Sequence, residues 1–420
     1  MRVAHLLRKY NPAEWGGTET AMQRLFDGLQ GRDVSSVVYC PRLAGNGYPV
    51  DPLAAVGCTV KRFRACVPVW GIPRERKEQM IAVGGNLLSF DLITSLWREA
   101  GVSLIHSHTL GRVGGIGLTM ARRRRIPFVV TVHGGVYDLP DEVKRSLHTP
   151  DAGGWEWGKI FGGLLRSRRV LVDADAIITC NPCEAAMIRR RHPDRRVIVQ
   201  PHGVPARVYQ RDHRAAARAA FPWLAGRPVL LAVGRIDPVK NQRWLVDRMP
   251  ELLRRHPRAL LVLAGACTDE AYGEALRHQI AQLHLERNVI LAGRLPPADP
   301  CLIGLMQEAQ AVVLPSLSET FGLVLIEAWA AGTAVIASQT SGATALIEHG
   351  KNGWLFELAR PETFHDAVHL TLTNPNWRAR SIAAGHHRVI ADYDTVVLAG
   401  RMKQLYEQLI EEKHALRHPA

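Results

Sequence analysis

The stretch that decides the fold reads Leu314-Pro315-Ser316-Leu317-Ser318-Glu319-Thr320-Phe321-Gly322-Leu323-Val324-Leu325-Ile326-Glu327-Ala328-Trp329-Ala330-Ala331. An apolar run ending at Pro315 is followed by a turn rich in Ser and Thr and then by a second apolar run, which predicts a strand, a loop and the start of a helix. Eight residues at a helical rise of ~1.5 Å would place Glu319 and Glu327 roughly 12 Å apart, about the length of a nucleotide sugar from its pyranose to its ribose. The helix start between them favours an anion such as a diphosphate.

Glu327 also has a plainer interpretation. It lies in an otherwise apolar helix, where a buried carboxylate is costly unless it is ion-paired or hydrogen-bonded. A structural ion pair with an arginine is therefore the alternative to a role in ligand binding.

The pattern of Glu319, seven residues and Glu327, with Phe321-Gly322 soon after the first Glu, resembles the hallmark of retaining GT-B glycosyltransferases of family 4, also called glycosyl transferases group 1. This resemblance implies an α/β fold with two Rossmann-like, doubly wound parallel-sheet domains facing across a cleft. It implies that Glu319 hydrogen-bonds the donor sugar and that Glu327 holds the ribose hydroxyls. The helix start at Phe321, Gly322 and Leu323 would stabilise the departing diphosphate.

The length of 420 residues predicts two domains. Because Pro201-His202-Gly203-Val204 matches the family's inter-domain turn, we expect an acceptor-side Rossmann-like domain at residues 1–205 and a nucleotide-sugar-binding domain at 206–385. Strands that alternate with a helical pattern in the second half indicate a parallel sheet. By resemblance, a helical segment at 386–420 would cross back onto the first domain.

The start of the chain shows no signal peptide, because its apolar residues are interrupted at Arg8 and Lys9, and no apolar run reaches the ~18 residues of a membrane-spanning helix. We therefore expect a cytoplasmic protein. Seven cysteines, an odd number, suit a reducing compartment and argue against a disulfide framework. Cys180 and Cys183 form a CxxC without a second pair, so we interpret them as buried thiols rather than a zinc or redox site.

The formal net charge of +14 is unevenly placed, with 30 Lys and Arg against 18 Asp and Glu up to Gln210. Its basic runs are Arg122 to Arg125, Arg166 to Arg169, and Arg189 to Arg196. Such runs are usually solvated faces, but an excess confined to one domain predicts an anionic surface, either phospholipid headgroups on the inner face of the membrane or a phosphorylated acceptor. Nucleic acid ranks well behind, because no recognised nucleic-acid module appears.

Two glycines, Gly16 and Gly17, directly precede an amphipathic helix at residues 21–29, and glycines at this place let a backbone approach an anionic ligand closely. By resemblance, Gly17 borders the donor phosphates and the reaction centre. His106 and His108 stand at alternate positions of a strand and hence on one face. We interpret them as lining of a cleft rather than metal ligands.

His133 follows a buried strand at residues 128–132, and ligands of open α/β sheets bind at the carboxyl ends of the strands. By resemblance, it contacts the donor sugar and helps to stabilise the positive charge that develops at the anomeric carbon. An exposed loop histidine is the alternative.

Arg235 and Lys240 lie on the loop that follows the strand at residues 229–233 and opens a helix. Arg can fork onto two oxygens and Lys supplies a point charge, so the pair forms a diphosphate clamp. The spacing of Gly234-Arg235, four residues and Lys240-Asn241 matches the family's donor-phosphate motif.

Two other motifs suggest different chemistry; we reject the first, and the second leaves a competing class of function that the sequence fits less well. Asp173-Ala174-Asp175 has the form of the metal-binding DxD of GT-A enzymes, but it stands at the entry to a strand, where Asp serves a turn. The glycine-rich run from Gly111 to Gly117 does not fit GxGxxG, so a nicotinamide-dependent oxidoreductase is the weaker class.

We therefore expect a retaining, metal-independent transfer of a sugar from a nucleotide-sugar donor to a hydroxyl of a lipid-linked, polysaccharide or small-molecule acceptor, with no cofactor. Arg235, Lys240 and the helix start would stabilise the leaving diphosphate, Glu319 would orient the sugar, and a donor phosphate oxygen would act as the base. The alternatives are a GT-B nucleotide-sugar epimerase and a catalytically silent nucleotide-binding subunit.

Overall fold

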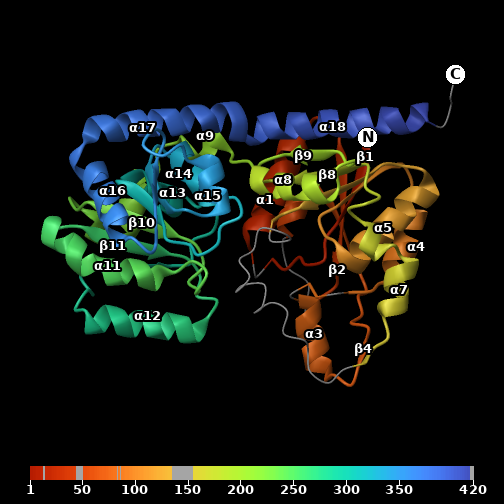
Figure 1. Ribbon diagram of the computed structural model, residues 1–420, viewed down its shortest axis with the longest axis horizontal. Coiled ribbons are helices and arrows are strands. Elements are labelled where there is room, and N and C mark those ends of the chain that lie inside the picture. Colours follow the sequence, from red (N-terminus) through yellow and green to blue (C-terminus); the bar gives the residue numbers. More distant parts are fainter. Residues whose placement is uncertain (13–14, 44–50, 83, 86, 135–154, 417–420) are drawn as a thin grey trace. The chain divides into compact units, whose positions relative to one another are not determined.

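The computed structural model describes residues 1–12, 15–43, 51–82, 84–85, 87–134 and 155–416. The chain forms two compact units, one of Met1–His202 with Thr395–Ala420 and one of Gly203–Asp394 (Figure 1). Each unit is built around a parallel sheet with helices on its faces, so the predicted α/β class with two Rossmann-like domains is confirmed.

The first sheet follows the order β3-β2-β1-β5-β6-β8-β9, and all its strand pairs are parallel. Its central strands are buried along nearly their whole length, which explains why they read as continuous apolar runs. The strands are β1 (Arg2–Leu6), β2 (Ser35–Pro41), β3 (Thr59–Phe63), β5 (Val102–Ser107), β6 (Phe128–Val132), β8 (Ala176–Thr179) and β9 (Val197–Val199). The helices of this part are α1 (Gly17–Leu29), α2 (Pro52–Ala55), α3 (Arg74–Ala82), α4 (Phe90–Arg98), α5 (Gly111–Arg124), α7 (Lys159–Leu164) and α8 (Pro182–Arg191).

The second sheet follows the order β12-β11-β10-β13-β14-β15 and is also parallel throughout. The strands are β10 (Val229–Val233), β11 (Leu260–Ala264), β12 (Val289–Gly293), β13 (Ala311–Leu314), β14 (Ala334–Ser338) and β15 (Trp354–Phe356). The helices are α9 (Ala206–Tyr209), α10 (Arg214–Ala220), α11 (Gln242–Arg255), α12 (Glu270–Gln282), α13 (Pro300–Glu308), α14 (Leu323–Ala330), α15 (Ser341–Leu346), α16 (Pro361–Thr373) and α17 (Pro375–Arg388).

Short elements complete both units. A two-stranded antiparallel ribbon pairs β4 (Val69–Trp70) with β7 (Trp155–Glu156). The 3₁₀ turns are η1 (Ser167–Arg169) and η2 (Pro222–Leu224), and the π-helix η3 (Val389–Tyr393) follows α17.

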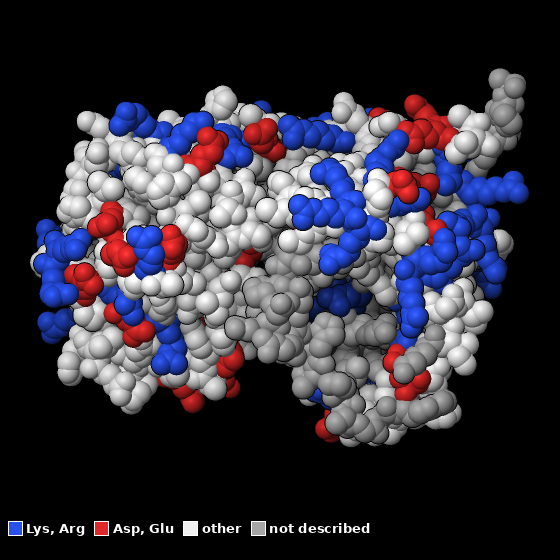
Figure 2. Space-filling view, in the orientation of Figure 1, with Lys and Arg blue, Asp and Glu red and all other residues white. Residues whose placement is uncertain are grey.

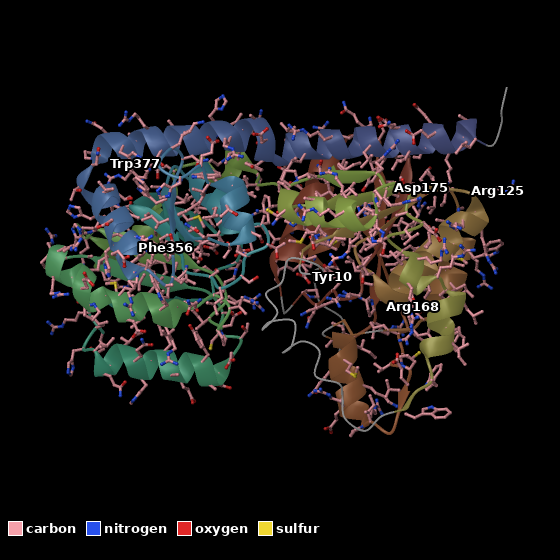
Figure 3. The ribbon with its side chains drawn as sticks, viewed as in Figure 1. Tyr10, Arg125, Arg168, Asp175, Phe356 and Trp377 are labelled. Atoms are coloured by element: carbon pink, nitrogen blue, oxygen red, sulfur yellow. The ribbon has the colours of Figure 1, made fainter. Side chains whose placement is uncertain are left out.

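Charge is distributed unevenly over the face in Figure 2, where Lys and Arg gather on the first unit and alternate with Asp and Glu on the second. In the second unit, Phe356 is fully buried in the core, whereas Trp377 lies on α17 and stacks on Trp354 (Figure 3).

The last helix, α18 (Thr395–Ala415), covers one face of the first sheet. Its buried residues Met402, Tyr406 and Leu409 form one apolar cluster with residues of β1, β5, β6 and β8. We expected the C-terminal segment from residue 386, but residues 386–394 belong to the second unit and the chain re-enters the first unit at Thr395.

The glycine-rich run at residues 111–117 is part of α5 and serves packing. A Cβ on Gly117 would lie 2.4 Å from Leu6 Cδ1, so only glycine allows the helix to lie this close to the sheet. All seven cysteines are free, but Cys183 is exposed, so our prediction of two buried thiols holds only for Cys180. Among the described residues, no helix is both long and apolar enough to cross a membrane.

Candidate functional site

The loop after β10 presents the two predicted cations at the carboxyl edge of the second sheet. Arg235 is largely exposed and pairs with Asp237 at 3.0 Å. Asp237 is buried and its other carboxylate oxygen accepts the Lys240 backbone N–H at 2.9 Å. This carboxylate, which we did not predict as a site residue, therefore fixes the conformation of the loop that carries both cations.

The loops after β10 and β13 are joined to each other, because these two strands are neighbours in the sheet. Asn241 donates a side-chain hydrogen bond to the carbonyl of Pro315 at 3.1 Å, and the Leu317 N–H donates to the carbonyl of Val239 at 2.8 Å. The structure thus brings together the two motifs that the sequence separates by about eighty residues.

Lys240 and Glu319 are in direct contact, with 2.5 Å between Lys240 Nζ and Glu319 Oε2. Their side chains are 22% and 19% exposed, so the pair is partly shielded but still reachable by a ligand. Lys carries three N–H donors. The donors not directed at Glu319 can therefore bind an anion without breaking this ion pair.

Helix α14 begins at Leu323, later than we assumed for the Glu319 to Glu327 distance. Gly322 precedes it in a left-handed conformation with φ 92°, and Glu319 lies on the loop before it. The estimate of roughly 12 Å was therefore based on a wrong premise, because it applied a helical rise to eight residues. Phe321 is buried, so its ring offers no surface to a ligand, and contact of its backbone with a donor stays a prediction.

Gly342 holds the loop of Glu319 in place and was not among the predicted site residues. Its N–H donates to the carbonyl of Glu319 at 2.8 Å. A Cβ on Gly342 would lie 2.6 Å from the backbone nitrogen of Phe321, which explains the need for glycine. Glu327 lies on α14, is 6% exposed and is not without an interaction partner. Its contact with a ribose stays a prediction.

In the first unit, adjacent strand ends bring several histidines together. His5 on β1 stands opposite His106 on β5 in the strand register, and His108 and His133 follow β5 and β6. His5 Nδ1 lies 3.1 Å from His108 Nε2, and His108 Nδ1 lies 3.0 Å from His133 Nε2. The ring of His202 stacks on that of His133 with 5.5 Å between centroids.

The three imidazoles of His5, His108 and His133 form a directional chain. A neutral imidazole has one N–H and one lone pair, so the tautomer of one ring sets that of the next. His5 Nε2 and His133 Nδ1 are buried ends of the chain without a hydrogen-bond partner among the described residues. If His133 carries a proton on Nδ1, then His5 Nε2 has none and is free to accept. If instead His5 carries a proton on Nε2, then His133 Nδ1 is the free acceptor.

Burial keeps these imidazoles neutral. It lowers the pKa of His5 to about 3 and that of His133 to about 4. It also lowers the pKa of His106 and His108 well below the usual value, with neighbouring histidines adding to the effect. His5 was not predicted as a site residue. The signal that could have identified it is a lone polar residue inside the apolar run of a buried strand.

The imidazoles of His5, His106 and His108 each have a nitrogen within 4.8 Å of the others, a spacing that a metal ion could use. Both ring nitrogens of His106 are, however, 2.6 Å from hydroxyls, those of Tyr406 and Thr131. A metal would have to displace one of these hydroxyls. Our interpretation of His106 and His108 as lining rather than ligands stays a prediction.

Gly17 is the exposed first residue of α1. The carboxylate of Glu19 accepts the Gly16 N–H at 3.1 Å and so fixes the glycine pair at the helix start. Contact of Gly17 with donor phosphates is likewise a prediction.

The aspartates of the rejected DxD motif have protein partners. Asp175 accepts the backbone N–H of Phe128 at 2.8 Å and pairs with Lys413 at 2.7 Å. Asp173 pairs with Arg122 at 3.0 Å and with two further arginines. These contacts support a structural role.

Two family profiles match the chain. The profile of the "Glycosyl transferase 4-like domain" matches residues 16–203, and that of "Glycosyl transferases group 1" matches residues 214–388.

Relatives are named D-inositol 3-phosphate glycosyltransferase. That of Thermobispora bispora is 30% identical over 338 residues, covering 78% of this chain and 76% of the relative. That of Nocardia farcinica is 33% identical over 272 residues, but the match covers 63% of this chain and only 57% of the relative. That of Corynebacterium jeikeium is 28% identical, with 99% and 98% covered.

Solved structures resemble the whole fold. HepE of Anabaena in complex with UDP has a TM-score of 0.74 at 20% identity, with 97% of this chain and 100% of HepE covered. Sucrose-phosphate synthase of Thermosynechococcus elongatus has a TM-score of 0.71 at 23% identity, with 98% and 99% covered. At these identities the likeness concerns the fold alone.

Proposed function

The chain belongs to family 4 of the GT-B glycosyltransferases, and on that premise we propose that it moves a sugar from a nucleotide-sugar donor to an acceptor hydroxyl with retention at the anomeric carbon. The observation that carries the proposal is the contact of Lys240 with Glu319 on two joined loops beside the start of α14. A cation that could bind the diphosphate and a carboxylate that could bind the sugar are thus in direct contact, which supports the proposal.

Uridine diphosphate sugars are the first donors to test. Structures of HepE, which shares the fold, are described as complexes with UDP and with UDP-glucose. The relatives are named for inositol 3-phosphate. A phosphorylated polyol is therefore the first acceptor to test in the transfer assay, and lipid-linked and polysaccharide acceptors should be tested next.

The main barrier to transfer is the charge that develops on the leaving diphosphate. Arg235, Lys240 and the N–H groups at the start of α14 would stabilise this charge without a metal. Glu319 would orient the sugar by hydrogen bonding, and a donor phosphate oxygen would accept the proton of the attacking hydroxyl.

His133 is suited to the positive charge of the transition state because its imidazole is neutral. An imidazolium would repel the charge at the anomeric carbon, and burial lowers the pKa of His133 to about 4. His108, hydrogen-bonded to His133, would hold that ring in one tautomer.

The test compares two lysines of the second unit that each pair with a glutamate. Lys240→Ala removes a cation and leaves Glu319 uncompensated, so nucleotide binding and transfer should both fall by about 100-fold or more. Lys351→Ala breaks the exposed pair with Glu348 and should leave both unchanged. Calorimetry with UDP and a transfer assay with UDP-glucose provide the two readouts.

Glu319→Gln separates orientation from binding. It keeps a hydrogen-bonding group and removes the charge, so nucleotide affinity should persist while kcat falls. Wild-type kinetics in both Lys240→Ala and Glu319→Gln would refute the site. Conversion of the donor into an epimeric nucleotide sugar, with no glycoside formed, would indicate the epimerase, and nucleotide binding without turnover would indicate the silent subunit.

A further inference from the structure

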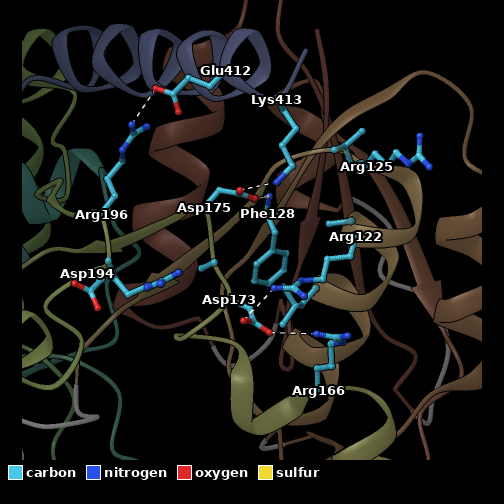
Figure 4. Close-up of a pocket in the computed structure, with 15 residues that line it drawn as sticks. Arg122, Arg125, Phe128, Arg166, Asp173, Asp175, Asp194, Arg196, Glu412 and Lys413 are labelled. Carbon is cyan, nitrogen blue, oxygen red and sulfur yellow. Dashed lines mark hydrogen bonds and ion pairs between the residues drawn. The ribbon is translucent and has the colours of Figure 1, made fainter. Parts of the chain in front are cut away.

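The three basic runs of the first half converge on one pocket. A cavity of about 730 Å³ in the first unit is lined by residues from all three runs and from the end of α18 (Figure 4). Its lining residues are Leu118, Ala121, Arg122, Arg125, Ile126, Phe128, Arg166, Asp173, Ala174, Asp175, Asp194, Arg195, Arg196, Glu412 and Lys413.

This pocket lies at the amino ends of the strands. Its residues immediately precede or begin β6, precede β8 and precede β9. His108 and His133 instead follow the carboxyl ends of β5 and β6. The pocket and the histidine chain are therefore at opposite edges of the same sheet, and the proposed transfer chemistry does not use the pocket.

Positive charge exceeds negative charge in the lining, with six cations and four carboxylates. Three of the carboxylates are already neutralised. Asp175 pairs with Lys413 and Glu412 with Arg196. Asp173 is shared by Arg122, by Arg166 and, most closely, by Arg169, and these arginines hold the pKa of its carboxyl below the usual value.

Two further arginines add positive charge to the rim. The Arg195 side chain has no hydrogen-bond or ion-pair partner among the described residues. Arg125 is exposed and ends α5 in a left-handed conformation with φ 56°. Glycine or asparagine is the usual residue at such a position, so a functional reason for an arginine is expected there.

Favourable interaction with the helix dipole is the competing explanation for the run at the end of α5. Cations in the last turn of a helix do stabilise it. That explanation does not account for Arg166, Arg195 and Lys413, which reach the same cavity from other segments.

We propose that this pocket binds a phosphate group, presented either by a phospholipid headgroup or by a soluble phosphorylated molecule. A phosphate carries a charge of about −1.5 to −2, and several guanidinium groups around one cavity match its oxygens by forked hydrogen bonds. The cavity has the size of a headgroup or a small metabolite. The proposal is independent of the transferase chemistry at the carboxyl edges.

The test removes the two rim cations and compares the result with an equal loss of charge elsewhere. Arg125→Gln with Arg195→Gln is the pocket variant, and Arg98→Gln with Arg190→Gln is the control, in which both arginines are exposed in the same unit. Arg98, Arg125 and Arg190 are exposed and Arg195 is half-buried, so both variants should melt close to the wild type, which thermal denaturation checks. Inorganic phosphate binding is followed by ³¹P NMR with UDP present to occupy the donor site.

The pocket variant should bind phosphate about tenfold more weakly or worse, and the control should stay within about twofold of the wild type. Flotation with vesicles of phosphatidylcholine mixed with phosphatidylglycerol then identifies the source of the phosphate. Loss of flotation in the pocket variant alone indicates a headgroup, and unchanged flotation indicates a soluble ligand. Equal phosphate binding in all three proteins, or an equal loss in both variants, would overturn the proposal.

Discussion

Acidification should unfold the first unit through its buried histidines. His5 and His106 are fully buried and His108 is 8% exposed, and their pKa values lie far below the value near 6.5 of an unfolded chain. Between the folded and unfolded pKa values the unfolded state binds more protons. The contribution to stability is therefore present above about pH 6.5 and is lost as the pH falls.

The size of the effect follows from proton linkage. As the pH falls from 7 to 5.5, each imidazole that stays neutral in the folded state lowers the free energy of unfolding by about 1.2 kcal/mol. The three buried histidines give about 4 kcal/mol. His133 and His202, whose pKa values burial also lowers, raise the sum to about 6 kcal/mol. That is a large share of the ~5–15 kcal/mol that stabilises a typical domain.

Hydrogen exchange at several pH values, read from peptides of β1, β5 and β6, measures this loss in the first unit itself. His5→Asn keeps a hydrogen-bonding group and should reduce the pH-dependent loss by about 1.2 kcal/mol, whatever its effect at pH 7. His414→Gln changes an exposed residue and should leave the loss unchanged. A wild-type loss below about 2 kcal/mol over this range would refute the reasoning.

Three further predictions concern packing and the donor loop. Tyr406→Phe removes the hydroxyl that is hydrogen-bonded to a buried imidazole, so urea denaturation should show a loss of about 1–3 kcal/mol. Gly117→Ala should cost a similar amount through overpacking, whereas Gly163→Ala, with no atom near the added Cβ, should not destabilise the protein. Gly342→Ala should displace the loop of Glu319, because the added Cβ meets backbone atoms, so calorimetry should show weaker UDP binding and a lower melting temperature.

Prediction from sequence succeeded where one residue pattern has one structural meaning. The run over β13 is fully buried and bounded by a turn, so its apolar pattern predicted a strand correctly. The pattern at Ser35–Pro41 begins with two serines, and this strand was not predicted. It becomes a strand because β1 and β3 pair with it on either side.

The candidate site was predictable by motif but not in its geometry. The local pattern does not show that the helix begins only after Gly322. Because it does, Glu319 lies on the preceding loop and the helical rise does not apply to its distance from Glu327. His5 gained its place beside His106 only through strand register. Long-range pairing of this kind is decided by the whole sheet.

The helix α18 has a consequence for the order of events during synthesis. The face of the first sheet that Met402, Tyr406 and Leu409 cover stays open until α18 has left the ribosome. Nearly two hundred residues of the second unit are made in the meantime. The first part to emerge would thus be the last to finish folding, and a nascent chain stopped before Thr395 should expose an apolar surface that chaperones can bind.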